Sequence, residues 1–425
     1  MKRNHMMSAV VIAIAGATFL SLSACSGGGT TTTPSSPAET PTTTQPPQPI
    51  SLTVSGPQAA MDANGWVPTM ETQFQAQYPQ YAITWNNKNI PESDAGTQIT
   101  KDPSSSPNVY MFSNDQLGAL IQAKAIGALN DTVTAQVQQQ NSQTLLQSVT
   151  SGGQLYGVPY TANTWFMYYN KSKVSDPSNL DTILQTATVN FSIENSWYFP
   201  SFYVGAGMTL YGPDGTDESA GIVLGDNATD VTKYLVALVA NKNFVPNSNI
   251  KASASGSANF SADVVFDGAW DASLAKDAYG DNYAAAQPPT FTLNGTAYQM
   301  KAFAGSKAIA WNPSAGDALT QQAAQAFAAF LGSTASQQVM YTDLNQIPSD
   351  QTLASDPTIS ADPVFTAQND TMANASILQP SNASMNNNFW APGNTFGYAL
   401  VSKQVTNANA EAKTAAWGKG MNGQA

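Results

Sequence analysis

Strand-like and helix-like segments alternate along the chain from Ile50 onward, and this order is what most restricts the folds open to it. A strand shows as alternating apolar and polar residues, and a helix as apolar residues that recur every three or four positions. By these patterns, strands are predicted at 50–54, 81–85 and 108–112, and helices at 66–78, 117–129 and 318–331. Short strands separated by helices indicate an α/β fold in which a mainly parallel sheet is covered by helices.

The ends of these strands are where a ligand site is expected. In open α/β sheets, ligands bind in the crevice outside the carboxyl ends of the strands. We therefore predict ligand-binding loops after Val54 and after Phe112. This prediction concerns position alone and leaves the identity of the ligand open.

The residue types that the chain lacks exclude several chemistries. Its only histidine, arginine and cysteine are His5, Arg3 and Cys25, all close to the N-terminus. The rest of the chain therefore has no Ser–His or Cys–His nucleophile pair, no zinc or copper site built from His or Cys, and no arginine to clamp a carboxylate or phosphate. Because the net charge is −12, we also expect no nucleic-acid partner. The amides, carboxylates, hydroxyls and aromatic rings that remain suit a neutral ligand rich in hydroxyl groups, and we expect no metal and no cofactor.

The N-terminal residues have the pattern of an exported lipoprotein. Lys2 and Arg3 precede the apolar run Ala9–Leu22, which is short for a membrane span. The run ends in Leu22-Ser23-Ala24-Cys25, which resembles the lipobox of bacterial lipoproteins. The resemblance implies that residues 1–24 are a signal peptide and that Cys25 carries a lipid; an uncleaved membrane anchor and a plain signal peptide are the alternatives.

A linker follows the cysteine. Residues 25–49 are rich in Thr, Pro and Ser and show no apolar periodicity. Such a composition buries too little apolar surface to fold, so the segment is predicted to be disordered. Together with the lipobox, it implies an extracytoplasmic domain anchored to the outer face of the membrane, as in Gram-positive bacteria.

Several segments, taken in order, resemble the maltose/maltodextrin-binding branch of the extracellular solute-binding proteins. They are Ser106–Gly118, Tyr156–Tyr160 with Tyr168–Lys171, Phe266–Trp270, Ala326–Gln337 with Ile347-Pro348, and Asn388–Trp390. Each motif alone is weak, but their shared order and spacing extend over about residues 50–420. The chain is therefore identified as a member of this branch.

The resemblance implies a two-lobed clamp with the ligand in the cleft between the lobes. Because chains of this family cross the hinge three times, each lobe is discontinuous in sequence. The crossings are expected near Tyr160–Asn163, Phe303–Lys307 and Ile347–Asp350. The N-lobe would then comprise 50–161 and 306–348, and the C-lobe 162–305 and 349–425.

The resemblance also implies the residues that contact a sugar. Trp197, Trp270 and Trp390 fall where family members place aromatic platforms, since the C–H face of a sugar ring packs well on an indole. A place in the apolar core is the alternative for each. Phe112 and Asp115 fall on the N-lobe ligand turn, where Phe112 could equally face inward from a strand and Asp115 could equally cap a helix.

Two further positions concern the charge of the site. Asn163 occupies the hinge position where maltose binders carry an acidic residue, so an amide stands here in place of a carboxylate. Glu194, close to Trp197, is a candidate for the missing carboxylate. The substitution at Asn163 leaves open whether the sugar is a maltodextrin or another oligosaccharide.

The resemblance implies a binding protein and no enzyme. The expected function is to bind a neutral oligosaccharide, most simply maltose or maltodextrin, and to deliver it as a monomer to the permease subunits of an ABC importer. The same role for lactose, raffinose or a fructo- or xylo-oligosaccharide is one alternative. A secreted glycoside hydrolase, which needs two carboxylates and no histidine, is a second, and a wall-associated sugar-binding adhesin is a third.

Overall fold

The structure is a computed structural model of the chain, and it describes residues 46–213, 215–245, 247 and 258–424. The predicted signal peptide, the lipid anchor at Cys25 and most of the predicted linker lie outside the described residues. The first strand begins at Gln48, slightly before the predicted start of the folded part at Ile50. Within the described ranges, we found no helix that combines the length and the hydropathy needed to span a bilayer.

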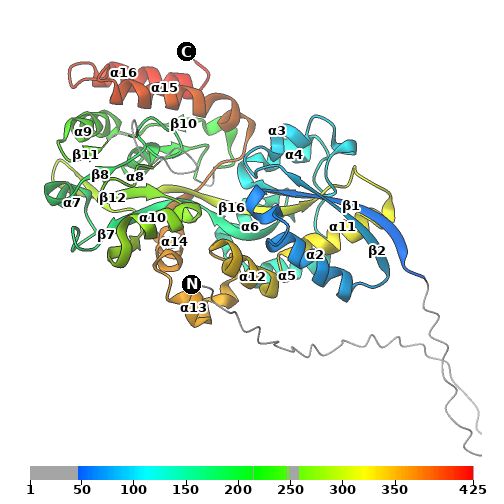
Figure 1. Cartoon of the computed structure of the whole chain (residues 1–425). Coiled ribbons are helices and arrows are strands. Elements are labelled where there is room, and N and C mark those ends of the chain that lie inside the picture. The colour runs from blue at the N-terminus through cyan, green and yellow to red at the C-terminus, as the bar shows by residue number, and fades with distance from the viewer. Residues whose placement is uncertain (1–45, 214, 246, 248–257, 425) are drawn as a thin grey trace, which may run out of the picture. The chain divides into compact units, whose positions relative to one another are not determined.

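A mixed sheet forms the centre of the first lobe (Figure 1). Among the described residues, its strands follow the order β17-β16-β3-β1-β2, and β6 also pairs with β16. The strands are β1 (Gln48–Gly56), β2 (Tyr81–Asn89), β3 (Val109–Ser113), β6 (Val158–Asn163), β16 (Ala302–Trp311) and β17 (Ser376–Leu378). Strand β1 is parallel to β2 and β3, and β16 is parallel to β17 but antiparallel to β3 and β6. Parallel pairings predominate in this sheet, as the sequence predicts.

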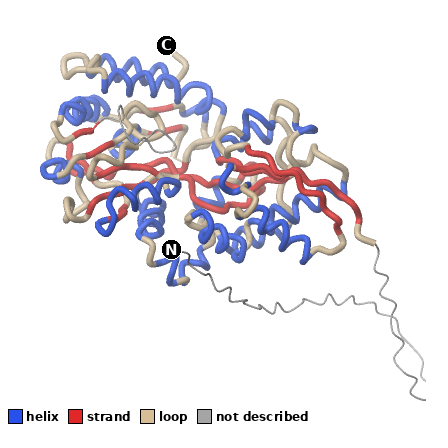
Figure 2. The backbone as a smooth tube through the Cα atoms, viewed as in Figure 1, coloured by secondary structure: helices blue, strands red, loops and turns tan. Residues whose placement is uncertain are grey.

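Helices cover the first sheet, and Figure 2 shows its strands running between them. They are α1 (Gln58–Met61), α2 (Trp66–Gln77), α3 (Ala95–Ile99), α4 (Leu117–Gln122), α5 (Asp131–Gln140), α6 (Gln143–Ser148), α11 (Ala318–Leu331) and α12 (Thr334–Leu344). The apolar faces predicted for α2 and α11 meet in the core, where the rings of Phe74 and Phe327 lie 5.1 Å apart, centroid to centroid. Burying such faces against one another is the main stabilisation of helices of this length.

One predicted helix is shorter than expected. The periodicity from Leu117 to Leu129 predicts a single helix, but α4 ends at Gln122. Lys124 adopts a left-handed backbone conformation with φ 55°. The amides of Lys124 and Ala125 then bond the carbonyls of Ile121 and Leu120, which closes the helix. The apolar residues that follow, including Ala125 and Ile126, pack into the core as an extended segment.

The second lobe contains a further mixed sheet. Its described strands follow the order β11-β8-β12-β7-β13. They are β7 (Phe166–Asn170), β8 (Val189–Asn190), β11 (Phe244–Val245), β12 (Val264–Asp267) and β13 (Tyr283–Ala286). Strand β8 is parallel to β11 and β12, whereas β7 is antiparallel to β12 and β13. Parallel pairings therefore do not predominate in this lobe, because the chain enters its sheet on a strand that runs against its neighbours.

Helices and short hairpins complete the second lobe. The helices are α7 (Leu180–Thr186), α8 (Pro200–Gly205), α9 (Ala228–Ala240), α10 (Ala272–Tyr279), α13 (Pro357–Ser360), α14 (Pro363–Asn374), α15 (Trp390–Val401) and α16 (Ala410–Met421). Outside the two large sheets lie the hairpin pairs β4–β5 (Thr150–Ser151, Gln154–Leu155), β9–β10 (Thr209–Leu210, Ile222–Val223) and β14–β15 (Thr290–Leu293, Thr296–Gln299).

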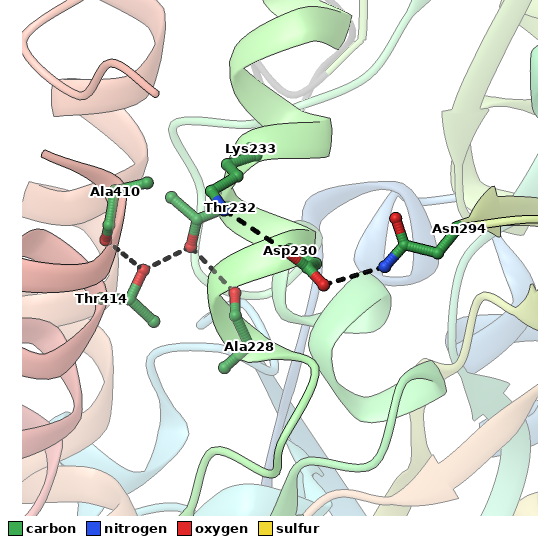
Figure 3. Close-up of polar contacts among 7 residues, drawn as sticks. All are labelled: Ala228, Asp230, Thr232, Lys233, Asn294, Ala410 and Thr414. Carbon is green, nitrogen blue, oxygen red and sulfur yellow. Dashed lines mark hydrogen bonds and ion pairs between the residues drawn. The ribbon is translucent and has the colours of Figure 1, made fainter. Parts of the chain in front are cut away.

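A buried polar contact joins the last helix to the second lobe (Figure 3). The hydroxyls of Thr232 on α9 and Thr414 on α16 hydrogen-bond each other, and each also lies within bonding distance of a carbonyl one turn earlier in its own helix. On the outer side of α9, Asp230 pairs with Lys233 and accepts a hydrogen bond from Asn294 of the β14–β15 turn. These contacts fix α9 between α16 and the hairpin.

Candidate ligand-binding site

A cavity of about 580 Å³ lies between the two lobes. Elements of both lobes contribute to it: the loops after β2 and β3, the end of β6, the strand β16, the loop after β17, the segments that follow β8 and β12, and the start of α15. Its lining residues are Pro91, Glu92, Ser93, Ser113, Asp115, Asn163, Trp197, Trp270, Lys307, Gln379 and Trp390. The first-lobe residues after β2 and β3 are at carboxyl strand ends, where a ligand is expected in an open α/β sheet.

Aromatic side chains form the second-lobe wall of the cavity. The rings of Trp197 and Trp270 lie 5.9 Å apart, centroid to centroid, with their planes inclined by 35°. The indole nitrogen of Trp197 donates a hydrogen bond of 2.9 Å to the side-chain oxygen of Gln379. Trp390, at the start of α15, is fixed by an edge contact with Phe303. All three tryptophans are partly exposed, so each presents apolar surface to the cavity.

The local sequence around Trp270 allows its ring to lie against the backbone. Trp270 lies three residues after the end of β12, and Gly268 and Ala269 intervene. A Cβ atom added at Gly268 would lie 2.2 Å from the Trp270 ring, well inside any normal contact. Glycine is therefore required at this position for the indole to take its place in the cavity wall.

Asp115 lies on the first-lobe side of the cavity. It belongs to a single turn of 3₁₀ helix, Asn114–Gln116, that follows β3. Burial in the cleft raises the pKa of the Asp115 carboxyl to about 6. The cavity therefore contains a carboxyl group that is ionised at neutral pH but ready to accept a proton in mild acid.

An ion pair lies on the same side of the cavity. The ammonium nitrogen of Lys307 is 3.2 Å from a carboxylate oxygen of Glu92, and the hydroxyl of Tyr160 donates a 2.6 Å hydrogen bond to that same oxygen. Burial alone would raise the pKa of Glu92, but Lys307 and Tyr160 outweigh burial and set that pKa below its usual value. Glu92 therefore favours the carboxylate form more strongly than Asp115 does.

Most of the residues predicted from the sequence meet at this cavity. Asp115, Asn163, Trp197, Trp270 and Trp390 all line it, although they come from distant parts of the chain. Of the two predicted ligand loops, the one after β3 contributes to the lining, whereas the one after Val54 does not. The strand β1 continues to Gly56, and that glycine packs against the side chains of Met61 and Met111 instead.

Two predicted residues lie elsewhere. Phe112 is fully buried in the first-lobe core, where its ring contacts that of Tyr110 at 6.2 Å. Every residue of β3 is buried, so the strand offers no polar face by which its inward and outward positions could be told apart. Glu194 is partly buried but does not line the cavity, and its side chain hydrogen-bonds Asn247. Its backbone packs against Gly397 of α15, which places this segment on the helix side of the lobe.

The sequence reasoning missed Glu92, Lys307 and Gln379. Glu92 lies three residues beyond the observed end of β2 at Asn89, so the rule applied to Val54 and Phe112 indicates its loop once the strand is extended to its full length. Lys307 is a single cation within the largely apolar strand β16, which is a recognisable signal. Gln379 lies in an irregular loop whose position depends on the pairing of β17 with β16, and no local pattern indicates it.

Comparison with known families agrees with this architecture. The family model described as bacterial extracellular solute-binding protein matches residues 69–367, which is more than half of the chain. The chain belongs to this family. Members of the family bind solutes and are not enzymes, so this solute-binding protein is a binding protein and not an enzyme. In the described residues, no cluster of His, Cys, Asp or Glu is arranged to bind a metal ion.

Individual relatives are moderately similar to this solute-binding protein. A protein solved with acarbose is 36% identical, with 88% of this chain and 99% of that chain covered and a TM-score of 0.81. A maltooligosaccharide ABC transporter solute-binding lipoprotein of Streptococcus pneumoniae R6 is 27% identical over 340 residues, or 73% of this chain and 74% of the relative. The maltodextrin-binding protein MalE1 of L. casei BL23, without ligand, is 24% identical with a TM-score of 0.78, over 88% of this chain and 99% of that one. This last likeness concerns the fold alone, and it confirms the predicted two-lobed α/β architecture.

Proposed function

We propose that this solute-binding protein binds a neutral oligosaccharide, most simply a maltodextrin, and delivers it to the permease of an ABC importer. The observation that carries the proposal is the composition of the cavity. Indole rings form one wall, and amide and carboxylate groups face them from the hinge and the first lobe. Sugar rings have apolar C–H faces and hydroxyl edges, so they need both kinds of surface at once.

The polar groups of the cavity suit hydroxyl ligands. Asp115 offers carboxylate oxygens that accept hydroxyl protons, and such charge-assisted bonds are worth roughly 1.5–3 kcal/mol each. Asn163 and Gln379 offer amides, which both donate and accept. The cavity volume of about 580 Å³ accommodates more than a single sugar ring.

The relatives support a maltodextrin as the first candidate. The names of the similar proteins include maltooligosaccharide, maltotriose and acarbose binders. The amide at Asn163 is the observation that favours keeping lactose, raffinose and fructo- or xylo-oligosaccharides as second candidates, because an amide replaces the expected carboxylate in the cavity. The sugar must therefore be identified by direct binding.

We further propose the division into lobes and the membrane attachment that the sequence suggests. In this proposal, 50–161 with 306–348 and 162–305 with 349–425 close on the ligand by a hinge motion. The position of β6 in the first sheet and of β7 in the second supports the first crossing. The pairing of β17 with Ala302–Ala304 extends the first sheet into residues that this division assigns to the second lobe, so these strands lie at the hinge. Lipidation of Cys25 and the linker 25–49 would keep the protein, as a monomer, at the outer membrane surface near its permease.

A thermal-shift and calorimetry screen of the purified protein tests the proposed ligand. The panel holds maltose, maltotriose, maltotetraose, acarbose, lactose, raffinose, a fructo-oligosaccharide and xylotriose. Because a ligand that binds only the folded protein raises its melting temperature by mass action, we expect the maltodextrins to raise Tm and the other neutral sugars to have little effect. A rise with another sugar alone would reassign the substrate, and no rise with any sugar would refute sugar binding.

A tryptophan variant in the same screen tests the cavity. Trp270→Ala removes a platform, so we expect affinity for maltotetraose to fall at least about tenfold while the fold is retained. Trp85→Ala is the matched control, because Trp85 packs against Phe74 and Phe327, away from the cavity. Equal binding by Trp270→Ala and the wild type would contradict the assignment of this cavity as the sugar site.

The same samples test the alternative functions. Release of shorter sugars from maltotetraose would favour a hydrolase, and retention by insoluble glycan alone would favour an adhesin.

A further inference from the structure

The cavity for a neutral ligand contains a cation. Lys307 is the one basic residue among the described residues that line it. It lies on β16, opposite Ser113 of β3 and Thr161 of β6, in the strand shared by the first lobe and the hinge. Its side chain is 15% exposed, and the residues that follow it on the strand, Ala308 to Ala310, are fully buried. A lysine at such a position has a desolvation cost, which calls for a physical explanation.

The ammonium group touches both walls of the cavity. On the first-lobe side it forms the 3.2 Å ion pair with Glu92, whose side chain is itself only 7% exposed. On the second-lobe side it lies 5.2 Å from the centre of the Trp270 ring, over the ring face. Both distances are within the range of attraction for an ion pair and for a cation on an indole face. Lys307 therefore lies over a face of the ring against which a sugar is expected to pack.

The pair with Glu92 fixes the ammonium without using all its donors. An ammonium group has three N–H donors. Among the described residues, Glu92 is the carboxylate within ion-pairing distance of it, and the bond from Tyr160 holds that carboxylate in place. Asp115, the other carboxyl of the cavity, forms no ion pair in the described residues. The ammonium thus retains donors for a ligand that contacts the Trp270 ring.

We propose that Lys307 is a specificity-determining residue, which donates a hydrogen bond to one hydroxyl of the sugar ring that packs on Trp270. Glu92 and Tyr160 are positioning residues for it, since they orient the ammonium. The inference rests on the proposed sugar-binding function, and it adds one selected hydroxyl to that function. A ligand with no oxygen beside the Trp270 platform would leave the ammonium without a partner on that side and would be bound weakly.

Lys307→Met is the central variant in the test, because methionine keeps much of the length but cannot donate. We expect its affinity for maltotetraose to fall about tenfold, as measured by calorimetry on the purified protein. Glu92→Gln, which leaves the ammonium present, should change affinity by less than about threefold. The double variant Glu92→Gln with Lys307→Met removes the unpaired carboxylate and should recover the melting temperature without recovering the affinity. Lys301→Met is the matched control, because Lys301 precedes the same strand and does not line the cavity.

Monodeoxy maltotrioses separate a ligand contact from a structural role. Suppose that Lys307 donates to one hydroxyl of the sugar. The deoxy sugar that lacks this hydroxyl should then bind the wild type about tenfold more weakly than intact maltotriose does. To Lys307→Met, the same deoxy sugar and intact maltotriose should bind equally well. Equal losses for every deoxy sugar in both proteins would overturn the proposal for Lys307 and leave sugar binding intact. Normal sugar binding by Lys307→Met would also overturn the proposal for Lys307. A loss of affinity in Glu92→Gln as large as in Lys307→Met would overturn it as well. A wild type that binds none of these sugars would overturn both the inference and the proposed function.

Discussion

At the residue scale, the two carboxylates of the cavity differ because their neighbours differ. Glu92 is buried next to the ammonium of Lys307 and the hydroxyl of Tyr160, and its pKa is lowered. Asp115 is buried without an ion-pair partner in the described residues, and its pKa is raised to about 6. Two carboxyl groups in one cavity therefore differ: the ionised form of Glu92 is stabilised, whereas Asp115 titrates near pH 6.

The titration of Asp115 predicts a pH dependence of binding. If the carboxylate accepts sugar hydroxyl protons, protonation removes that acceptor, so affinity for maltotetraose should be about tenfold weaker at about pH 5 than at about pH 7. Asp115→Asn should remove most of this dependence. Calorimetry across this pH range checks it, and a wild-type affinity that stays constant throughout would contradict the role of Asp115.

The buried carboxyl groups whose pKa is raised should make the folded protein less stable as pH rises. For a carboxyl whose pKa is raised on folding, the unfolded chain loses its proton first, so the free energy of unfolding falls as pH rises toward the folded pKa. Asp115, at about 6, and Glu71 on α2, raised by burial to about 7, both contribute in this direction. Because Glu71 hydrogen-bonds Asn87 and does not line the cavity, Glu71→Gln should alter the pH profile of stability without altering that of binding.

At the element scale, close contacts between backbone segments set the positions of the residues that line the cavity. Helix α15 carries Trp390 at its start and Gly397 about two turns later, on the face that meets the segment before Trp197. A Cβ at Gly397 would lie 2.1 Å from the carbonyl oxygen of Ile193. Helix α15 and the Trp197 segment can approach this closely because position 397 has no side chain, and the approach brings Trp390 and Trp197 to one cavity.

Gly397→Ala tests this contact because two effects on stability have opposite signs. Helix propensity alone predicts stabilisation by about 1 kcal/mol. The clash with a backbone oxygen, which cannot rotate away, predicts a net loss of about 1–3 kcal/mol. We expect the net loss of stability, measured as a lower midpoint of urea unfolding, together with weaker sugar binding.

Gly420→Ala on α16, where a Cβ would lie 3.3 Å from a side-chain carbon of Pro392, is the control and should change stability little. Stabilisation by Gly397→Ala would show that the segment moves freely.

At the scale of the whole folded unit, both lobes build the candidate site. The first lobe contributes Glu92, Asp115 and Lys307, and the second contributes Trp197 and Trp270. Neither set offers both apolar faces and hydroxyl partners. A ligand that needs both therefore binds most strongly when the lobes are together, and this differential affinity is what drives closure in a hinged protein.

Closure can be followed by small-angle X-ray scattering. We expect saturating maltotetraose to lower the radius of gyration of the purified protein, because the lobes approach each other. Trp270→Ala should show the same decrease only at about tenfold higher sugar concentration. An unchanged radius of gyration in a wild type that binds the sugar would show that the cleft is already closed or that its lobes do not move.

The sequence by itself determined the fold class and most of the cavity. Local patterns are sufficient for the fold class, because periodicity reports which residues face a core, as in α2 and α11, whereas the cavity residues followed from the resemblance to a known family. The order of short motifs then indicated Asp115, Asn163, Trp197, Trp270 and Trp390 together. The absence of His and Arg beyond the N-terminus restricted the chemistry of the ligand without any structural information.

Only the tertiary structure decided which of these residues face the cavity and which polar groups join them. The sequences around Phe112 and Glu194 are as consistent with a ligand site as those around the residues that line the cavity. Phe112 is instead buried in the first-lobe core, and the segment of Glu194 packs against α15. The end of α4 at Gln122 depends on one left-handed residue, Lys124, which apolar periodicity cannot report. The pairing of Lys307 with Glu92 joins residues far apart in sequence. Such contacts arise from the packing of whole elements, so no local pattern contains them.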